Sequence, residues 1–532
     1  MPATSDVLIV GGGHNGLVCA AYLAAAGLKV TVLERRHVVG GAAVTEEFHP
    51  GFRNSVASYT VSLLNPKVIR DLDLHGHGLK IVEREIANFL PTEDGRYLAI
   101  GAGRTKEEVA KFSRKDADLL DVYAERLEVI ADVFRELVLE TPPNVVEGGW
   151  RVALPEMLRA AKIGGRFSKL NLATRQELLT LFASSAGDYL DGWFESDPIK
   201  AVYGFDGIVG NFNSPYAPGS AYVLLHHVFG EVNGKKGVWA HAIGGMGAIT
   251  QAMAKCAASR GVDIRLDAGV REIIIENGVA VGAVTESGER FRASAVVSNL
   301  NPKLLYLKLL DPGVLPSAFR QRINQWRCGS GTFRMNVALS RLPNFSALPG
   351  PGDHHTAGII LAPSLAYMDR AYRDCVRDGW SRMPIVEMVI PSTLDDSLAP
   401  RDAHVASLFC QHVASQFTDG STWEQHRETV ADLMIDTVDA YAPGFKASVI
   451  GRQSLSPFDL HRVFGLPHGD IFHGAMTLGQ LFSARPMLGY ADYRMPIAGL
   501  YLCGAGAHPG GGVTGAPGHN AAQAVIADLL RT

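Results

Sequence analysis

Residues 1–34 alternate between apolar runs and a single cluster of glycines. Residues 6–10 form a short apolar run that predicts a buried strand, and residues 17–26 carry apolar side chains at helical spacing. Between them, residues 11–16 read GGGHNG and predict a tight turn. A β-branched run follows at residues 29–34. The pattern therefore predicts a strand, a glycine-rich turn, a helix and a second strand, which is how many α/β domains begin.

The pattern changes several times beyond this first block. Residues 105–235 are mostly helical by spacing, whereas residues 310–485 mix strands with helices. The middle and the C-terminal end return to short β-rich runs followed by helices. The elements expected beyond residue 105 are helices over 116–139, 172–190, 248–260, 423–441 and 518–530, and strands over 261–266, 270–275, 279–285, 290–297, 333–339, 385–390, 404–412 and 499–503.

The glycine cluster has the spacing of a dinucleotide-binding turn. Gly11 allows a tight turn after the strand, Gly13 allows a pyrophosphate to approach the backbone, and Gly16 allows the helix to pack closely on the strand. The free N–H groups at the start of the helix then face the phosphates. Glu34 follows at the distance where a carboxylate accepts both hydroxyls of an adenosine ribose, and it would repel the 2′-phosphate of NADP.

Two further stretches favour FAD over NAD. The glycine pair Gly40–Gly41 allows a second close backbone approach, beside the pyrophosphate and ribityl chain. The C-terminal stretch 499–515 reads as a strand and a glycine-rich turn before the last helix. A helix that begins there directs its N–H groups and its dipole at the N1–O2 edge of a flavin, where reduction builds negative charge.

These segments predict an α/β fold with a discontinuous Rossmann-like FAD-binding domain and an inserted α+β substrate domain. The expected FAD-binding segments are 1–104, 236–309 and 486–532. Residues 105–235 would form a helical substrate or lid region, and residues 310–485 would form the substrate domain proper. A chain of 532 residues is long enough for more than one domain.

Composition and charge exclude several classes of function. The net charge is −4, so the chain lacks the basic surplus that binding to nucleic acid requires. The six cysteines are scattered without metal-ligand spacing, which predicts no metal site and free thiols in a reducing compartment. No run of eighteen apolar residues exists, and the first strand begins too early for a presequence. We therefore expect a cytoplasmic protein of bacterial type.

The N-terminal block, the middle block from Trp239 and the C-terminal stretch together resemble the phytoene desaturase-like branch of the FAD amine oxidase-type flavoproteins. The resemblance covers nearly the whole chain and implies an FAD-dependent oxidoreductase, whose eukaryotic relatives are mitochondrial. Many relatives carry arginine after the glycine pair, where it clamps the flavin phosphates. Ala42 stands there in this chain, and Arg36 matches the family's other basic position.

The motifs and the resemblance together give a set of expected FAD contacts, without a catalytic residue. They are Gly11, Gly12, Gly13, Asn15, Gly16, Glu34, Arg35, Arg36, Gly40, Gly41, Ala42, Ala43, Thr45, Val270, Gly504, Ala505, His508, Gly511, Gly512 and Val513.

A few side chains are candidates for a sharper role. His508 contacts the flavin or the substrate, or equally braces its loop through a backbone hydrogen bond, and a catalytic role is the less favoured interpretation. Tyr59 either reaches the substrate face or is a plain buried tyrosine. For His473, His226 and His227, the sequence favours ordinary structural histidines with satisfied hydrogen bonds.

The stretch Arg151–Arg175 is rich in cations interleaved with apolar residues. One interpretation is a membrane-surface patch through which a lipophilic substrate enters. The favoured interpretation is a solvated helical face that caps the substrate domain, because Gly164–Gly165 would interrupt a long amphipathic helix.

The expected reaction is dehydrogenation or desaturation of an apolar organic substrate, with hydride passing to flavin N5 and then to oxygen or a quinone. The flavin carries this chemistry, which explains why no acid–base pair or nucleophile stands out in the sequence. Amine oxidation, redox-neutral isomerisation of a polyene and a non-catalytic role for FAD remain alternatives. The sequence leaves the oligomeric state open.

Overall fold

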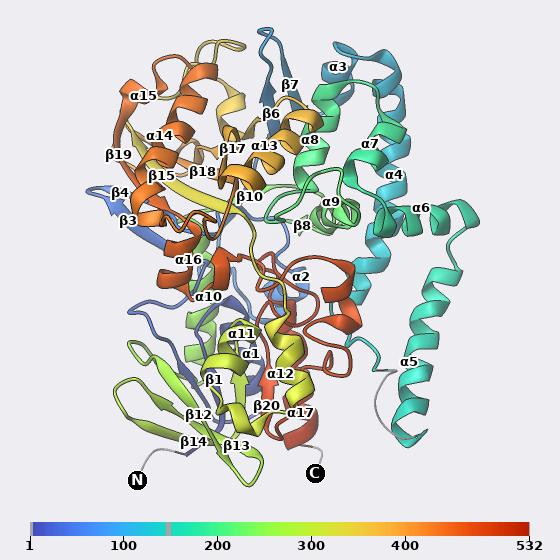
Figure 1. Ribbon diagram of the computed structural model, residues 1–532, viewed down its shortest axis with the longest axis vertical. Helices are drawn as coiled ribbons and strands as arrows, with labels where there is room; N and C mark the ends of the chain where they lie inside the picture. The colour runs from blue at the N-terminus through green and yellow to red at the C-terminus, as the bar shows by residue number, and fades with distance from the viewer. Residues whose placement is uncertain (1–3, 145–149, 531–532) are drawn as a thin grey trace.

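The computed structural model describes residues 4–144 and 150–530, and two seven-stranded sheets dominate it (Figure 1). The first sheet lies in the lower half of Figure 1 and has the order β11-β2-β1-β14-β13-β12, with β20 paired to β14. The pairs β1–β2, β2–β11, β1–β14 and β14–β20 are parallel, whereas β12, β13 and β14 are antiparallel to one another in turn. Its strands are β1 (Thr4–Val10), β2 (Val30–Leu33), β11 (Asp263–Arg265), β12 (Val270–Glu276), β13 (Val279–Thr285), β14 (Arg290–Ser298) and β20 (Leu500–Leu502).

Three helices from distant parts of the chain support this sheet. They are α1 (His14–Ala25), α10 (Met246–Ser259) and α17 (Ala516–Leu529), and α1 packs against both of the others. Because α1 packs against α10, α17 and the strands β1 and β2, most of its side chains are buried, as its apolar composition requires. Segments far apart in the sequence therefore assemble one Rossmann-like domain, as predicted.

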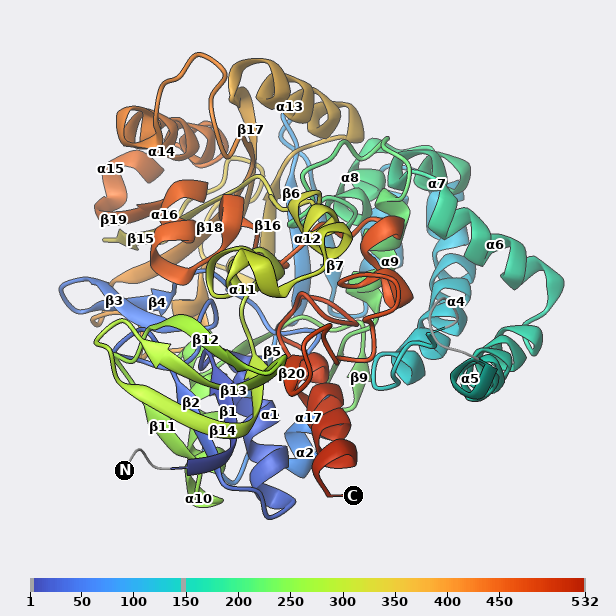
Figure 2. The same ribbon diagram turned by 60° about the horizontal axis from the view of Figure 1, so that its bottom comes forward.

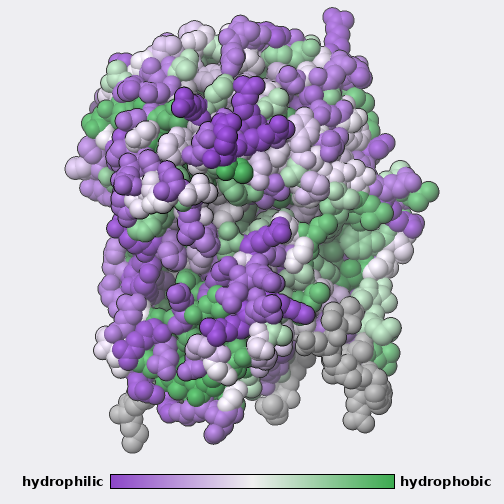
Figure 3. Space-filling model, in the orientation of Figure 1, coloured by the Kyte–Doolittle hydropathy of each residue, from purple (hydrophilic) through white to green (hydrophobic). Residues whose placement is uncertain are grey.

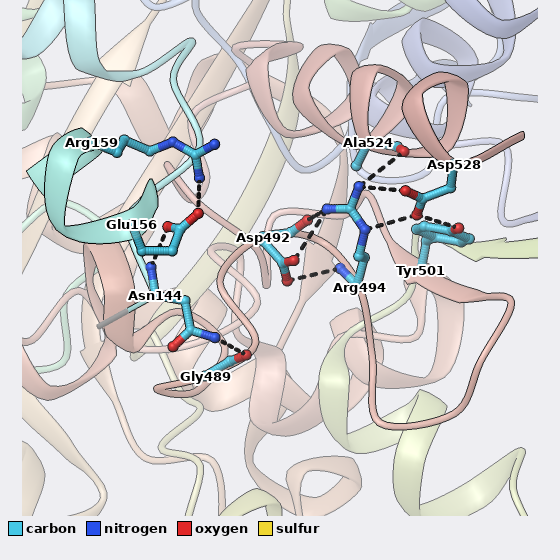
Figure 4. Close-up of polar contacts among 9 residues, drawn as sticks. All are labelled: Asn144, Glu156, Arg159, Gly489, Asp492, Arg494, Tyr501, Ala524 and Asp528. Carbon is cyan, nitrogen blue, oxygen red and sulfur yellow. Dashed lines mark hydrogen bonds and ion pairs between the residues drawn. The ribbon is translucent and has the colours of Figure 1, made fainter. Parts of the chain in front are cut away.

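Salt bridges fix the C-terminal segment to this domain (Figure 4). The Arg494 guanidinium binds Asp528 of α17 at 2.7 Å and Asp492 at 3.1 Å. Tyr501 of β20 donates its hydroxyl proton to the same Asp528 carboxylate at 2.8 Å. Strand β20 and helix α17 are thereby held in one orientation, which sets the position of the loop between them.

The second sheet lies above the first in Figure 1 and has the order β19-β15-β18-β17-β16-β6-β7. Helix α14 (Trp423–Tyr441) packs on one face, and α13 (Leu365–Asp378) and α8 (Asp197–Asp206) pack on the other. The strands are β6 (Ile86–Pro91), β7 (Tyr97–Gly101), β15 (Thr332–Leu339), β16 (Gly358–Leu361), β17 (Trp380–Val389), β18 (His404–Val413) and β19 (Val449–Leu455).

One predicted boundary differs from this arrangement. Residues 86–101 were assigned to the first FAD-binding segment, 1–104, but β6 and β7 belong to the second sheet. The reason is that β6 pairs in parallel with β16 along Gly358–Ile359, a partner some 270 residues away in the sequence. Sequence spacing carries no signal for such a pairing.

A helical layer covers the edge of the second sheet. Its helices are α3 (Thr105–Ala110), α4 (Arg114–Leu137), α5 (Trp150–Ser168), α6 (Leu172–Ala183), α7 (Ala186–Trp193) and α9 (Ser220–Val228), together with α8. The single helix predicted over 172–190 is two helices, because Ser185 caps α7 by accepting a hydrogen bond from the Asp188 N–H at 2.9 Å. Among the described residues, no helix has the length and apolarity that crossing a bilayer requires.

Short elements connect these layers. They are β3 (Thr45–His49), β4 (Phe52–Ser55), α2 (Pro66–Asp71), β5 (Ile81–Glu83), β8 (Glu231–Val232), β9 (Lys235–Lys236), β10 (Ala240–Ala242), α11 (Pro302–Lys308), α12 (Ser317–Asn324), α15 (Phe445–Ser448) and α16 (Pro457–Phe464).

Candidate active site

A cavity of about 360 Å³ lies against the carboxyl ends of β1, β2 and β14 and continues to the second sheet. The carboxyl edge of parallel strands is where α/β proteins bind their ligands. At one end the lining comes from the N-terminal block and residues 299–301, and at the other end from Tyr59, Val209, Trp239, Phe409 and Phe472. We call these the cofactor end and the far end.

The start of α1 forms the floor of the cofactor end. Gly13 precedes the helix and gives it no side-chain cap, so the first N–H groups of α1 remain available to a ligand. A Cβ atom on Gly13 would lie 2.6 Å from Asn299 Nδ2, so the Asn299 side chain would have to move to admit a larger residue here. The geometry suits a diphosphate lying on the helix N-terminus.

Glu34 is buried at the end of β2 and is held by the backbone. Its carboxylate accepts hydrogen bonds from the N–H groups of Gly12 at 2.8 Å and Arg36 at 2.9 Å. A carboxylate has about four lone-pair sites, so two backbone bonds leave acceptors for a pair of ribose hydroxyls. The turn and the acid therefore form one rigid unit.

Arg36 supplies a positive charge beside this unit. It binds Glu46 at 2.6 Å and lies over the Phe464 ring at 5.0 Å. Its Nη1 atom is buried and has no hydrogen-bond partner among the described residues. A buried donor without a partner is costly, and an anionic diphosphate would satisfy it. The hydrogen-bond donors and the glycines of the cofactor end thus fit FAD. Position 42, where many relatives have an arginine, is an alanine in this chain, so it contributes no further arginine to the site.

Most of the expected FAD contacts lie together in the cavity wall, and five lie outside it. The Gly12 N–H instead donates a hydrogen bond to the Glu34 carboxylate. The Thr45 hydroxyl accepts a hydrogen bond from the Gly247 N–H at 2.9 Å. Direct contact of each residue with FAD stays a prediction. The residues that line the cavity are Gly11, Gly13, Asn15, Glu34, Arg35, Arg36, Gly40, Gly41, Ala42, Ala43, Val270, Ala505, Gly511, Gly512 and Val513, and those outside are Gly12, Gly16, Thr45, Gly504 and His508.

His508, an expected FAD contact, takes the alternative bracing position and does not line the cavity. Its ring is buried, Nε2 lies 3.1 Å from the carbonyl oxygen of Leu137, and Phe482 packs edge-on against it at 5.3 Å. Burial lowers the pKa of His508 to about 4, so the ring is neutral. The side chain is committed to α4 rather than to the cavity, because the loop folds back toward that helix.

Tyr59 lines the far end and is held by buried charges. Its hydroxyl donates a hydrogen bond to Glu387, and its ring stacks on Phe409 at 5.2 Å. The Arg334 guanidinium lies 4.7 Å from the centre of the Tyr59 ring. Burial, followed by the charge of Glu387, raises the pKa of Tyr59 well above its usual value, so the phenol stays protonated. Burial also raises the pKa of Glu387.

Three histidines lie at or beside the cavity, and the sequence interpretation holds for one of them. His227 Nδ1 bonds to the carbonyl of Val223 at 2.9 Å, as a satisfied structural histidine would. By contrast, His473 Nδ1 and His226 Nε2 are buried and have no hydrogen-bond partner among the described residues. Burial lowers the pKa of both rings to about 3, so they are uncharged polar groups.

Several lining residues were not predicted. Leu300 is one of them, whereas the sequence itself predicts Asn299 in a loop at the carboxyl end of the strand over 290–297, where α/β proteins bind ligands, and both residues line the cavity. Val209, Trp239 and Phe409 carry no such signal, because each comes from a different part of the chain and only tertiary folding brings it to the cavity.

Known proteins share this chain's sequence and fold. Residues 16–333 match the family described as "Flavin containing amine oxidoreductase". The chain is 43% identical to pyridine nucleotide-disulfide oxidoreductase domain-containing protein 2 of Rattus norvegicus, with 98% of this chain and 94% of the rat protein covered. It is 27% identical to phytoene desaturase (lycopene-forming) of Pantoea ananas, with 98% of this chain and 99% of that protein covered.

A solved structure agrees at the level of the fold. Cyclohexylamine oxidase from Brevibacterium oxydans IH-35A superposes with a TM-score of 0.57 at 15% identity, covering 99% of this chain and 100% of that one. The family predicted from the sequence, its α/β fold and its cofactor are confirmed. The chain belongs to the flavin-containing amine oxidoreductase family, within its phytoene desaturase-like branch, and is an FAD-dependent oxidoreductase.

Proposed function

We propose that the protein dehydrogenates or desaturates an apolar organic substrate bound at the far end of the cavity. The observation that carries this proposal is the lining of that end by Leu63, Val209, Trp239, Phe409 and Phe472. Substrate pockets are usually lined by such side chains with a few placed polar groups. FAD, when bound, supplies the acceptor for the hydride that leaves the substrate carbon.

The chain's own residues orient the substrate and exclude water. Tyr59 presents a ring fixed by Phe409, Arg334 and Glu387, so the cavity wall is rigid where a substrate carbon must be aligned. Tyr59 stays protonated near neutral pH, which suits it to packing and donation rather than to taking a proton. His473 offers the cavity wall an uncharged polar side chain.

The charge of the lining favours an apolar substrate over an amine. Among the described lining residues, the acids are Glu34 and Glu286, and both lie at the cofactor end with Arg35. The nearest acid at the far end, Glu387, is already bonded to Tyr59. An ammonium group would therefore lack a free carboxylate there. Isomerisation of a polyene by reduced flavin fits the same apolar lining and remains the second candidate.

We propose oxygen or a quinone as the acceptor of electrons from the reduced flavin, and a cytoplasmic site of action. Glu34 serves the FAD ribose, and the sequence carries one strand–glycine turn–helix fingerprint, so it offers no second nucleotide site with a basic partner for the 2′-phosphate of NADPH. The six cysteines are all free, which suits a reducing compartment.

Anaerobic mixing of the FAD-loaded protein with candidate substrates tests the proposal. Dispersed polyene hydrocarbons, aliphatic amines and NADPH would be compared by the loss of oxidised-flavin absorbance. Bleaching by a hydrocarbon with formation of a more unsaturated product is expected. In a parallel sample whose flavin has first been reduced with dithionite, formation of an isomer without reoxidation of the flavin would select isomerisation, and bleaching of the oxidised flavin by amines alone would overturn an apolar substrate.

A further inference from the structure

Helices α5 and α6 form an arm that stands off from the body of the protein (Figures 1 and 2). We use "arm" for residues 154–179. Its outer surface is unusually apolar for a surface helix pair, since five large apolar side chains are 56% to 70% exposed. They are Leu154, Met157, Leu158, Leu172 and Leu179. Apolar patches on a soluble protein mark places where something else binds.

The prediction that Gly164–Gly165 interrupts a long helix here is wrong. Helix α5 runs without a break from Trp150 to Ser168. The cost of two glycines in a helix, about 1 kcal/mol each, is offset where packing holds the helix in place. A continuous amphipathic surface over more than four turns is therefore available.

The apolar residues of α5 lie on two faces. Ile163 is 7% exposed and faces the body, and Phe167 packs toward Phe134 of α4 at 6.1 Å. At 100° per residue, Leu154, Met157 and Leu158 cluster on the opposite side of the helix. The outward face is apolar without a partner in the described structure, and Figure 3 shows green side chains along the edge where the arm lies.

Polar contacts fix which face points outward. Glu156 accepts a hydrogen bond from the Asn144 N–H at 2.8 Å, and the Asn144 side chain donates to the Gly489 carbonyl at 3.1 Å (Figure 4). Further along the helix, Arg166 pairs with Glu136 at 3.3 Å and also with Glu140. These contacts tie the inner face to the body, so the outer face is presented in a defined orientation.

The charge of the arm is opposite to that of the whole chain. Residues 154–179 hold five Lys and Arg against two Glu, which gives +3, whereas the chain carries −4. Lys162 is exposed one turn after Leu158, at the border of the apolar face, and Lys169 is exposed directly after the end of α5. The side chain of Arg151 lies outside the described residues. An apolar face bordered by cations is complementary to a bilayer with anionic headgroups.

We propose that the arm is a membrane-docking surface that inserts Leu154, Met157 and Leu158 at the boundary of an anionic lipid bilayer. Lys162 and Lys169 then contact the headgroups. The body stays outside the hydrocarbon region, since insertion of one helix face reaches only about 5–10 Å into the bilayer. The proposal rests on the arm alone and holds whatever substrate the cavity takes.

The test is flotation of the FAD-loaded protein with vesicles of phosphatidylcholine alone or with added phosphatidylglycerol. The wild-type protein is expected to float with the anionic vesicles and to be released by high salt. The partition coefficient of the Met157→Glu/Leu158→Glu variant should fall at least tenfold. That of Lys162→Glu/Lys169→Glu should fall by about fivefold or more for each lysine replaced, and only on the anionic vesicles.

Matched controls keep the result interpretable. Val376→Glu changes an apolar side chain of α13 that is 59% exposed and far from the arm, and it should leave flotation unchanged. Equal FAD content and melting temperature would show that the variants are folded. Absence of flotation by the wild type, or unchanged flotation of the Met157→Glu/Leu158→Glu variant, would overturn the proposal. So would a wild-type dimer that this variant converts to a monomer, because the face would then serve a second copy.

Discussion

The two ends of the cavity are built in different ways. The cofactor end takes most of its shape from residues 10–43, where backbone N–H groups, absent side chains and one acid held by the backbone do the binding. The far end takes side chains from positions between 59 and 472, and charges buried behind the wall hold them. The cofactor end is therefore determined by residues close together in the sequence, whereas the far end is determined by the packing of the two sheets.

This difference predicts that the two ends respond separately to substitution. Changes at the cofactor end should alter FAD affinity and folding together, because the same turn serves both. Changes at the far end should alter the rate of flavin reduction while FAD stays bound. The predictions below test this separation, beginning with the largest effect.

Gly16→Ala should nearly abolish FAD binding. A Cβ atom at this position would lie 2.3 Å from the Gly11 carbonyl oxygen, so the helix or the turn must move. We expect a loss of about 2–4 kcal/mol in the free energy of unfolding, read by chemical denaturation, and protein that purifies without flavin. Gly192→Ala in α7 has no atom within 4 Å of the new Cβ and should be neutral or slightly stabilising. If Gly16→Ala purifies with a normal FAD content, the turn 11–16 does not form part of the FAD site.

Glu34→Ala should weaken FAD binding by about 1–3 kcal/mol, or roughly five- to 150-fold. The variant loses the hydrogen bonds between Glu34 and the ribose hydroxyls. It also loses the two hydrogen bonds by which the Gly12 and Arg36 N–H groups are held. Titration of the apoprotein with FAD measures the effect. Glu47→Ala removes an exposed acid of β3 and serves as the control. If FAD affinity in Glu34→Ala equals that of the control, the acid does not hold the ribose.

Tyr59→Phe should leave FAD affinity unchanged and slow single-turnover flavin reduction by about ten- to a hundredfold, because the ring loses its anchor on Glu387. His508→Ala, which changes a side chain outside the cavity, should not slow reduction in FAD-loaded protein. A rate of flavin reduction more than about a thousandfold lower in Tyr59→Phe would indicate that the Tyr59 hydroxyl takes part in proton transfer rather than only aligning the substrate. Weakened FAD binding in Tyr59→Phe would break the separation of the two ends.

Asp206→Asn should have the smallest effect, on the pH dependence of stability. Burial, with Glu387 second, raises the pKa of Asp206 to about 8. The folded protein then keeps a proton that the unfolded chain releases, so stability falls as the pH rises from about 4 to 8. The variant lacks this titrating group, so its stability should not fall in this range. The melting temperature of the variant minus that of the wild type should therefore increase by about 2 °C or more from pH 5 to pH 8. Asp197→Asn, an exposed acid of α8, should show no such gain.

The sequence alone determined the parts that depend on neighbouring residues. The turn 11–16, Glu34 and the helices over 116–139 and 423–441 follow from glycine geometry and periodicity, and the structure has α14 at Trp423–Tyr441 as predicted. Asn277–Gly278, between the strands predicted over 270–275 and 279–285, is a dipeptide typical of a two-residue hairpin turn, and both residues have the positive φ that this turn requires.

Only the tertiary structure decided what distant residues do. It placed β6 and β7 in the second sheet, turned His508 toward Leu137 and kept α5 continuous through its glycines. It also left His473 Nδ1 without a hydrogen-bond partner within residues 4–144 and 150–530. The physical reason is the same in each case. A turn or a helix gains its free energy from contacts within a few residues, whereas pairing, burial and hydrogen-bond satisfaction depend on what the rest of the chain brings alongside.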